Sequence, residues 1–162
     1  MSRKTVEETS PGAAAPDEGI SHSAEAIHQE ISFNATPSRI YAVLTDAGLF
    51  QHLESFSDAM KSLDIRTHPA RISRKPGGAF SLFADYIVGR QIELIPGRRI
   101  VQAWRVESWR PGSYSLARFE LIAQRSGTQI RFDHTGFPAG DAEHLAAGWY
   151  ANYWEPLRKV LG

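Results

Sequence analysis

The sequence contains no cysteine, which excludes disulfide bonds, zinc–thiolate sites, iron–sulfur clusters and cysteine nucleophiles. It also lacks an excess of either charge, since 18 Lys and Arg balance 18 Asp and Glu among 162 residues. A neutral chain has no overall attraction to nucleic acid or to an acidic membrane surface. No apolar run approaches the roughly 20 residues of a membrane-spanning helix, and acidic and small residues follow Arg3 and Lys4 where a signal peptide requires an apolar stretch. We therefore expect a soluble cytoplasmic protein with no nucleic-acid partner and no membrane insertion.

Common catalytic motifs are absent as well. The chain has no G-x-S-x-G, no P-loop, no G-x-G-x-x-G and no H-E-x-x-H. Its six histidines do not have the spacing of a ligand set, and two imidazoles without a third ligand make a poor metal site. The sequence therefore predicts no metal and no cofactor, and it favours a binding protein over an enzyme.

The composition predicts one domain preceded by a tail. Residues 1–24 are rich in Pro, Gly, Ser and Ala and offer nothing large to bury, which is typical of disordered segments. Residues 25–162 have the length of a single domain. We therefore expect a disordered N-terminal tail over 1–24 and one folded domain over 25–162.

Hydrophobic periodicity predicts a strand, two helices, about six further strands and a final helix. Apolar and polar residues alternate from Ile27 to Phe33, the pattern of a half-buried strand. Thr36-Pro37 begins a helix that ends near Gly48. A second helix is predicted by an apolar stripe at steps of three or four: Leu49, Leu53, Phe56, Met60 and Leu63. Short turns separate strands expected at 70–74, 79–86, 87–95, 99–108, 113–124 and 128–135, with a bend or join at 85–89, so neighbouring strands should be antiparallel.

The last predicted helix is amphipathic and begins with Asp141 as its N-cap. One wide apolar face is expected from Ala142, Leu145, Ala146, Trp149, Tyr153, Pro156, Leu157 and Val160. A sheet with one apolar face is most simply covered by curling around this helix. The pattern thus predicts an α+β fold, with a curved antiparallel sheet around a long C-terminal helix and two short helices after the first strand.

Four residues of this helix carry further expectations. A regular helical wheel puts Trp154 about opposite the apolar face, under a loop or at a subunit contact, and puts His144 and Asn152 on the polar side. Pro156 cannot donate to the carbonyl of Asn152, so a kink or a frayed bond is expected there.

Several sequence blocks occur together in one order. They are Gly77-Gly78-Ala79-Phe80-Ser81, Ile87-Val88-Gly89-Arg90, Leu94 to Arg105, His134-Thr135-Gly136-Phe137-Pro138, Gly148-Trp149 and Tyr153-Trp154-Glu155-Pro156-Leu157. The region from Ile27 to Leu161 resembles the family named for the activator of heat-shock protein 90 ATPase, in its C-terminal-domain-like branch. That family is part of the START-like, helix-grip group, also called SRPBCC. The resemblance implies a helix-grip fold, and the stretch Leu49–Pro69, which departs from the family pattern, often borders the pocket in such folds.

A cavity between sheet and helix is the site that this fold leads us to expect. Its predicted wall residues are Phe83, Trp104, Phe119, Phe132, His134, Trp149 and Tyr153. For Trp149, core packing and a pocket wall follow equally from its place on the helix. A one-residue change in strand register would move any strand residue of this set to the other face.

His134 is the most informative ionisable residue. On its strand it shares a face with Ile130 and Phe132, whereas Asp133 points the other way and cannot orient the imidazole. A buried neutral imidazole could serve as a general base. The simpler interpretation, which we favour, is a core histidine with a local hydrogen-bond partner.

Three functional hypotheses follow. The first is a non-catalytic START-like domain that binds a small apolar or amphipathic molecule in the cavity. The second, implied by the family name, is a co-chaperone-like, stress-response partner of a heat-shock protein 90 homologue. The third is a polyketide-cyclase-like or hydrolase-like enzyme that uses His134. The partners expected are thus a small molecule and, as alternatives, a chaperone and a second copy of the chain in a homodimer.

Overall fold

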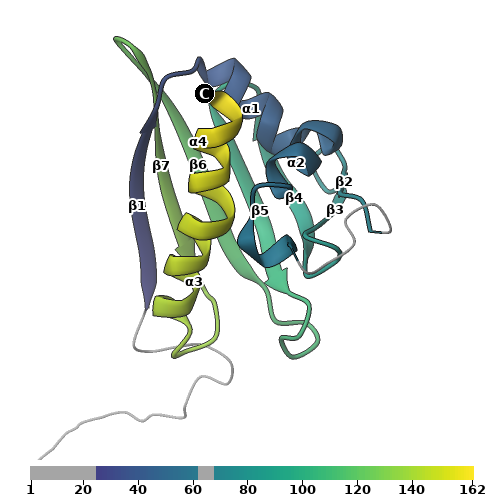
Figure 1. Ribbon diagram of the computed structural model, residues 1–162. Helices are drawn as coiled ribbons and strands as arrows, with labels where there is room; N and C mark the ends of the chain where they lie inside the picture. Colours follow the sequence, from purple (N-terminus) through teal and green to yellow (C-terminus); the bar gives the residue numbers. More distant parts are fainter. Residues whose placement is uncertain (1–24, 62–67) are drawn as a thin grey trace, which may run out of the picture.

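The computed structural model describes residues 25–61 and 68–162, and over these residues a seven-stranded antiparallel sheet curves around the C-terminal helix (Figure 1). The strand order is β1-β7-β6-β5-β4-β3-β2. The strands are β1 (Ala26–Phe33), β2 (Arg71–Ile72), β3 (Ala79–Leu82), β4 (Ile87–Ile95), β5 (Arg99–Val106), β6 (Ser115–Gln124) and β7 (Gly127–Thr135). The helical segments are α1 (Pro37–Thr45), α2 (Ala47–Glu54), the 3-10 turn η1 (Asp58–Met60), α3 (Ala142–Trp149), the π turn η2 (Tyr150–Trp154) and α4 (Glu155–Leu161). The predicted α+β helix-grip architecture is confirmed, while the predicted tail lies outside the described residues.

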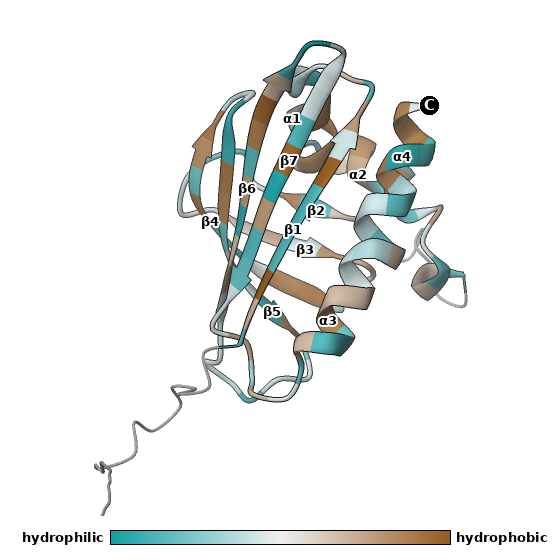
Figure 2. Cartoon of the chain, turned by 90° about the vertical axis from the view of Figure 1, so that its left-hand side faces the viewer, coloured by the Kyte–Doolittle hydropathy of each residue, from teal (hydrophilic) through white to brown (hydrophobic). Residues whose placement is uncertain are grey.

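The first strand shows how the sheet acquires one apolar face. Along β1 exposed and buried residues alternate, and Ile27, Ile31 and Phe33 point inward with Gln29 among them. Figure 2 shows the same alternation of hydrophobic and hydrophilic bands along neighbouring strands, with α3 and α4 on one side of the sheet. None of the helices in the part of the chain that the structure describes is long and apolar enough to cross a membrane.

The predicted second helix is shorter than its apolar stripe. Asp46 caps α2 by accepting from the N–H of Leu49 at 2.9 Å, but the helix ends at Glu54. Ser57 then adopts an extended conformation, and its hydroxyl donates to Asn152 of the C-terminal helix. The prediction of one continuous stripe was wrong here, because this side-chain bond and the extended backbone separate Met60 from α2. Leu63, the last member of the stripe, lies outside the described residues.

The junction between β3 and β4 also differs from the expectation. The sequence predicted a bend at 85–89, whereas the strands are separated by a turn at 83–86. Phe83, Ala84 and Asp85 adopt φ values of 54°, 54° and 69°. Three consecutive non-glycine residues in the left-handed region are unfavourable and need support from their surroundings.

The C-terminal helix contains a π turn that changes which residues face the sheet. The N–H of Glu155 donates to the carbonyl of Tyr150, five residues earlier, next to Pro156, which has no N–H to continue the α-helical pattern. The extra residue in this turn rotates Trp154 inward, where it is 1% exposed. The prediction that Trp154 lies opposite the apolar face was therefore wrong, whereas a helix irregularity at Pro156 was correctly expected.

Gly89 of β4 lies where β5 and the ring of Phe80 leave no room for a side chain. A Cβ built there would stand 2.0 Å from the carbonyl oxygen of Ala103 and 2.5 Å from Cζ of Phe80. Gly89→Ala should lower the free energy of unfolding by about 2 kcal/mol, measured by urea denaturation. Gly48→Ala in α2 is the control, because its Cβ would meet only Asp46 Oδ1, at 3.4 Å, and stability should not fall. Equal stability of the two variants would contradict the prediction.

Candidate functional site

A cavity of about 270 Å³ lies between α3–η2 and the β4–β5 side of the sheet. The β3–β4 turn and the loop after β5 contribute to its walls. Its lining residues are Ala59, Phe83, Tyr86, Ile87, Trp104, Val106, Ser108, Trp109, Asp141, His144, Leu145, Gly148, Trp149, Asn152 and Tyr153. A hollow thus lies between the C-terminal helix and the sheet in the described part of the chain.

Aromatic rings form a continuous wall of this cavity. The ring centroids of Trp104 and Trp149 are 5.3 Å apart, and those of Trp104 and Trp109 are 5.8 Å apart. Tyr153 continues the wall at 4.1 Å from Trp149 and 5.5 Å from Phe83. The Tyr153 hydroxyl accepts from the indole N–H of Trp104 at 3.5 Å, and burial raises the pKa of this phenol. The wall is thus apolar and joins β5, the C-terminal helix and two loops.

The C-terminal helix gives the cavity a polar flank. Asp141, His144 and Asn152 lie there, Ser108 adds a hydroxyl from the loop after β5, and Asp141 is the one Asp, Glu, Lys or Arg side chain among the described lining residues. The Asp141 carboxylate makes no hydrogen bond or ion pair with another residue of the described ranges and does not cap α3. Asn152 accepts the hydroxyl proton of Ser57 through Oδ1. The described lining therefore combines an aromatic wall with a single formal negative charge.

The seven predicted wall residues divide into two groups. Four of them line the cavity: Phe83, Trp104, Trp149 and Tyr153. Phe132 and His134 do not, since they pack against the far side of Trp149, with centroid distances of 4.2 and 5.4 Å. The reason is that the C-terminal helix lies over the β1–β7 end of the sheet, where Ala146 and Trp154 bond to Gln29, and leaves space on the β4–β5 side.

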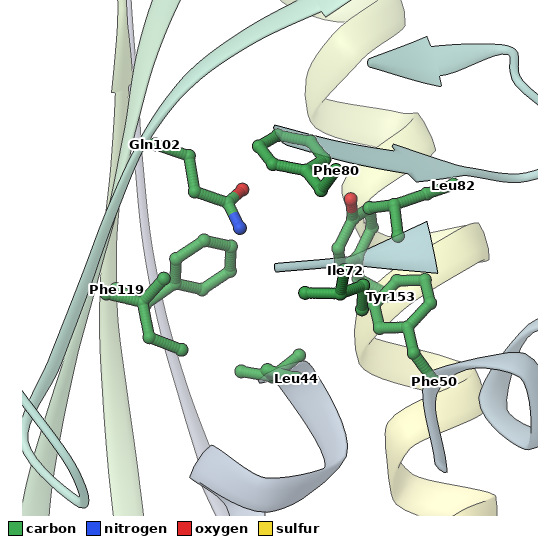
Figure 3. A pocket seen from close by; sticks show the side chains of 9 residues that line it. Leu44, Phe50, Ile72, Phe80, Leu82, Gln102, Phe119 and Tyr153 are labelled. Carbon is green, nitrogen blue, oxygen red and sulfur yellow. The ribbon is translucent and has the colours of Figure 1, made fainter. Parts of the chain in front are cut away.

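Phe119 borders a separate, smaller hollow. Figure 3 shows it with Leu44, Gln102 and Tyr153 around this space, whose volume is about 10 Å³. That is about the room of one water molecule. Phe119 therefore lies in the packed core next to Tyr153 and away from the larger cavity.

His134 belongs to a buried chain of hydrogen bonds. Trp149 Nε1–H donates to His134 Nδ1 at 3.0 Å, so Nε2 carries the ring proton and donates to Ser115 Oγ at 2.7 Å. The Ser115 hydroxyl in turn donates to the carbonyl of Trp104 at 2.9 Å. Burial lowers the pKa of His134 to about 3, and both ring nitrogens are occupied. This geometry fits the interpretation of a core histidine and leaves no nitrogen to accept a proton from a ligand.

Glu54 is a buried carboxyl that no sequence pattern singled out. The residue is fully buried at the end of α2, and its Oε2 accepts the N–H of Phe83 at 2.6 Å. Oε1 has no hydrogen-bond partner among the described residues. Burial raises the pKa of Glu54 to about 7, against the opposing effect of the Phe83 N–H. Glu54 thereby supports the left-handed turn that carries Phe83 into the cavity wall.

The outer face of the sheet has a second hollow, of about 330 Å³, over β3 and β4. It is lined by Arg71, Ala79, Phe80, Ser81, Val88, Gly89, Arg90 and Tyr114. The guanidinium of Arg90 donates to the carbonyl of Gly77 at 3.1 Å and meets no carboxylate within the described ranges. Towards β6 and β7, by contrast, Arg99 pairs with Glu120 at 2.7 Å. The β3–β4 half of the outer face therefore has an arginine that meets no carboxylate of residues 25–61 or 68–162.

Sequence reasoning missed the polar flank of the main cavity. His144 and Asn152 were predicted to face away from the apolar side of the helix, yet both line the cavity, as does Gly148. Asp141, Gly148 and Asn152 lie along one edge of the apolar face of the helix. Their spacing in the sequence was the signal that could have identified the polar flank. Among the described residues, no three His, Asp or Glu side chains are arranged to hold a metal ion.

Comparison with known proteins gives matches over most of the chain. The family model described as "Activator of Hsp90 ATPase homolog 1-like protein" matches residues 34–162. An uncharacterized protein of Schizosaccharomyces pombe is 31% identical over 84% of this chain and 37% of its own length. The human activator of 90 kDa heat shock protein ATPase homolog 1 is 27% identical over 81% of this chain and 35% of its own length. The match to a mouse homologue covers 38% of that protein's length. The chain therefore spans 35–38% of the length of these curated relatives.

Solved structures share the fold. An HSP90 activator from Plasmodium falciparum superposes with a TM-score of 0.73 at 25% identity, covering 85% of this chain and 96% of that one. The solution structure of an Aha1 dimer from Colwellia psychrerythraea gives a TM-score of 0.65 at 18% identity, over 85% and 96% of the two chains. The second likeness supports the fold alone.

The buried carboxyl of Glu54 predicts a specific pH dependence of stability. The folded protein holds the Glu54 proton more tightly than the unfolded chain, because its pKa is about 7 when buried and 4.5 when the carboxyl is fully in water. This stabilisation is complete below about pH 4.5 and is lost as the pH rises through about 7. Across that window the wild type should lose about 2–3 kcal/mol relative to Glu54→Gln, whose carboxamide keeps an acceptor for Phe83. Urea denaturation of both proteins at several pH values measures the difference, and parallel pH profiles would contradict the prediction.

Proposed function

The chain belongs to the family of Activator of Hsp90 ATPase homolog 1-like proteins, and from that premise we propose that it binds a small apolar or amphipathic molecule in the cavity between sheet and C-terminal helix. The observation that carries this proposal is the 270 Å³ hollow with its aromatic wall and polar flank. Such sites are mostly apolar and contain a few polar groups that orient the ligand.

The energetics of the wall support this proposal. Trp104, Trp149 and Tyr153 are at most 4% exposed, so their rings are already held in place before a ligand arrives. A preformed site costs little ordering on binding, while each Å² of apolar ligand surface removed from water contributes about 25 cal/mol. The same residues carry the packing of the helix on the sheet, so the wall is rigid for a structural reason.

Gly148 offers a way to fill the cavity without disturbing the core. It lines the cavity from α3, and the nearest atom to a Cβ built there is Asn152 Nδ2 at 3.8 Å. Gly148→Leu should occupy the space that a ligand needs, and Leu also has a better helix propensity than Gly. Ala147→Leu, at an exposed position of the same helix, is the matched control.

Native mass spectrometry of freshly purified protein tests this prediction. The wild type and Ala147→Leu should carry an additional mass that denaturation removes, and Gly148→Leu should have lost it while melting no lower than the wild type. The same spectra report monomer or dimer. Retention of the additional mass by a folded Gly148→Leu would refute the cavity as its site, and a wild type without additional mass would favour the candidate below.

A second candidate function is a co-chaperone-like role in the cytoplasm, as a stress-response partner of a heat-shock protein 90 homologue. The supporting observation is the similarity to a human protein named as an activator of that chaperone's ATPase and to a Plasmodium falciparum protein named as an HSP90 activator. The chain spans about a third of the length of the human relative. The activity of that whole protein is therefore a proposal for this chain. A protein partner would use the outer face of the sheet, where Arg90 has no carboxylate partner within the described ranges.

The two candidates predict different sensitive residues. If the chain stimulates the ATPase of a heat-shock protein 90 homologue, Arg90→Glu should reduce the stimulation several-fold, because it reverses the charge in the outer hollow. Arg125→Glu, in the exposed β6–β7 turn, and Gly148→Leu should have no effect on it. Loss of stimulation in Gly148→Leu but not in Arg90→Glu would assign the chaperone effect to the cavity instead.

A further inference from the structure

The cavity has a chemical preference that follows from its lining, and the inference drawn from it rests on the proposed ligand binding. Three indole rings, those of Trp104, Trp109 and Trp149, face the same space from β5, the following loop and α3. Indoles offer large aromatic faces on which the ring of a ligand can stack. A dry cavity of about 150 Å³ accepts benzene, so 270 Å³ suits a ligand with one or two fused rings.

The charges around the cavity are also unequal. No Lys or Arg belongs to the described lining, and Asp141 adds a carboxylate that has no partner among the described residues. The first turn of α3 opposes this charge, but a helix N-terminus is equivalent to only about half a positive charge. The Asp141 carboxylate therefore makes the net charge of the described polar flank negative.

Arg105 is a nearby cation that requires separate consideration. Its guanidinium donates to the carbonyls of Trp109 at 2.5 Å and Arg110 at 3.2 Å, and it lies 5.8 Å from the ring centroid of Tyr114. Arg105 therefore holds the loop of Trp109 through backbone carbonyls and is not part of the cavity lining. Its hydrogen-bond partners are neutral carbonyls, so it does not neutralise the negative charge at the polar flank.

We propose that the cavity selects small aromatic cations, with the ring system against the indoles and an ammonium-type group towards Asp141, over aromatic anions of the same size. In this arrangement the carboxylate attracts the ammonium-type group, while the indole rings stack on the aromatic part of the ligand. An aromatic carboxylate, by contrast, would bring a second negative charge to a site without a described Lys or Arg.

Three probes of similar size test this preference: 1-naphthylmethylammonium, 1-naphthalenemethanol and 1-naphthoate. Isothermal titration calorimetry is carried out at about pH 8, where an imidazole of ordinary pKa is neutral. The cation should bind roughly tenfold more tightly than the anion, a difference of about 1.4 kcal/mol, with the alcohol in between. Asp141→Asn should remove most of this difference and leave the affinity for the alcohol unchanged. Glu143→Gln, exposed in the same turn of α3 and absent from the lining, is the control and should keep the full difference.

The four tryptophans report where the probes bind. The indole N–H signals of Trp104, Trp109 and Trp149 in a ¹⁵N-labelled sample should shift more than that of Trp154, which donates to Gln29 away from the cavity. An anion that binds as tightly as the cation, or a cation preference unchanged in Asp141→Asn, would overturn the charge selectivity while leaving cavity binding intact. If none of the three probes binds, both the selectivity and the proposed cavity function fail.

Discussion

Two buried indole N–H groups hold the C-terminal helix on the sheet. Trp149 donates to His134 of β7 at 3.0 Å, and Trp154 donates to Gln29 of β1 at 2.7 Å. A buried donor without a partner costs about 1–3 kcal/mol, so helix and sheet can meet in few other registers. Both acceptors are themselves buried on the inner face, which explains why the strands place a histidine and a glutamine among apolar residues.

The π turn makes this double attachment geometrically feasible. In a regular α-helix, residues five apart such as Trp149 and Trp154 point about 140° apart, and only one could face the sheet. The π turn ends next to Pro156, which has no N–H to donate. Interrupting the α-helical hydrogen bonds therefore costs least at this residue. With the helix fixed over β1, β6 and β7, its other edge stands clear of β4 and β5, and the cavity occupies that space.

The inner cavity and the outer hollow lie on opposite faces of the same part of the sheet. The cavity uses Trp104 of β5 and the turn at Phe83, whereas the hollow uses Arg90 and Val88 of β4. A small molecule inside and a partner outside would therefore engage different side chains. Glu54 connects the end of α2 to this region, because its carboxylate supports the turn that brings Phe83 to the cavity.

Much of the architecture was determined by local sequence patterns. The antiparallel sheet and the order of elements were predicted from the alternation in β1, the Thr36-Pro37 helix start and the short turns between strands. The inward direction of His134 was predicted too, because side-chain direction in a strand depends only on the parity of the residue number. Tertiary structure decided the inward turn of Trp154, the early end of α2 at Glu54, and the selection of Trp149 over Phe132 as a cavity wall. These outcomes depend on hydrogen bonds and packing between residues far apart in the chain, such as Trp154 with Gln29. No local period encodes such contacts, so only the folded chain could establish where the helix leaves the sheet and what lines the space between them.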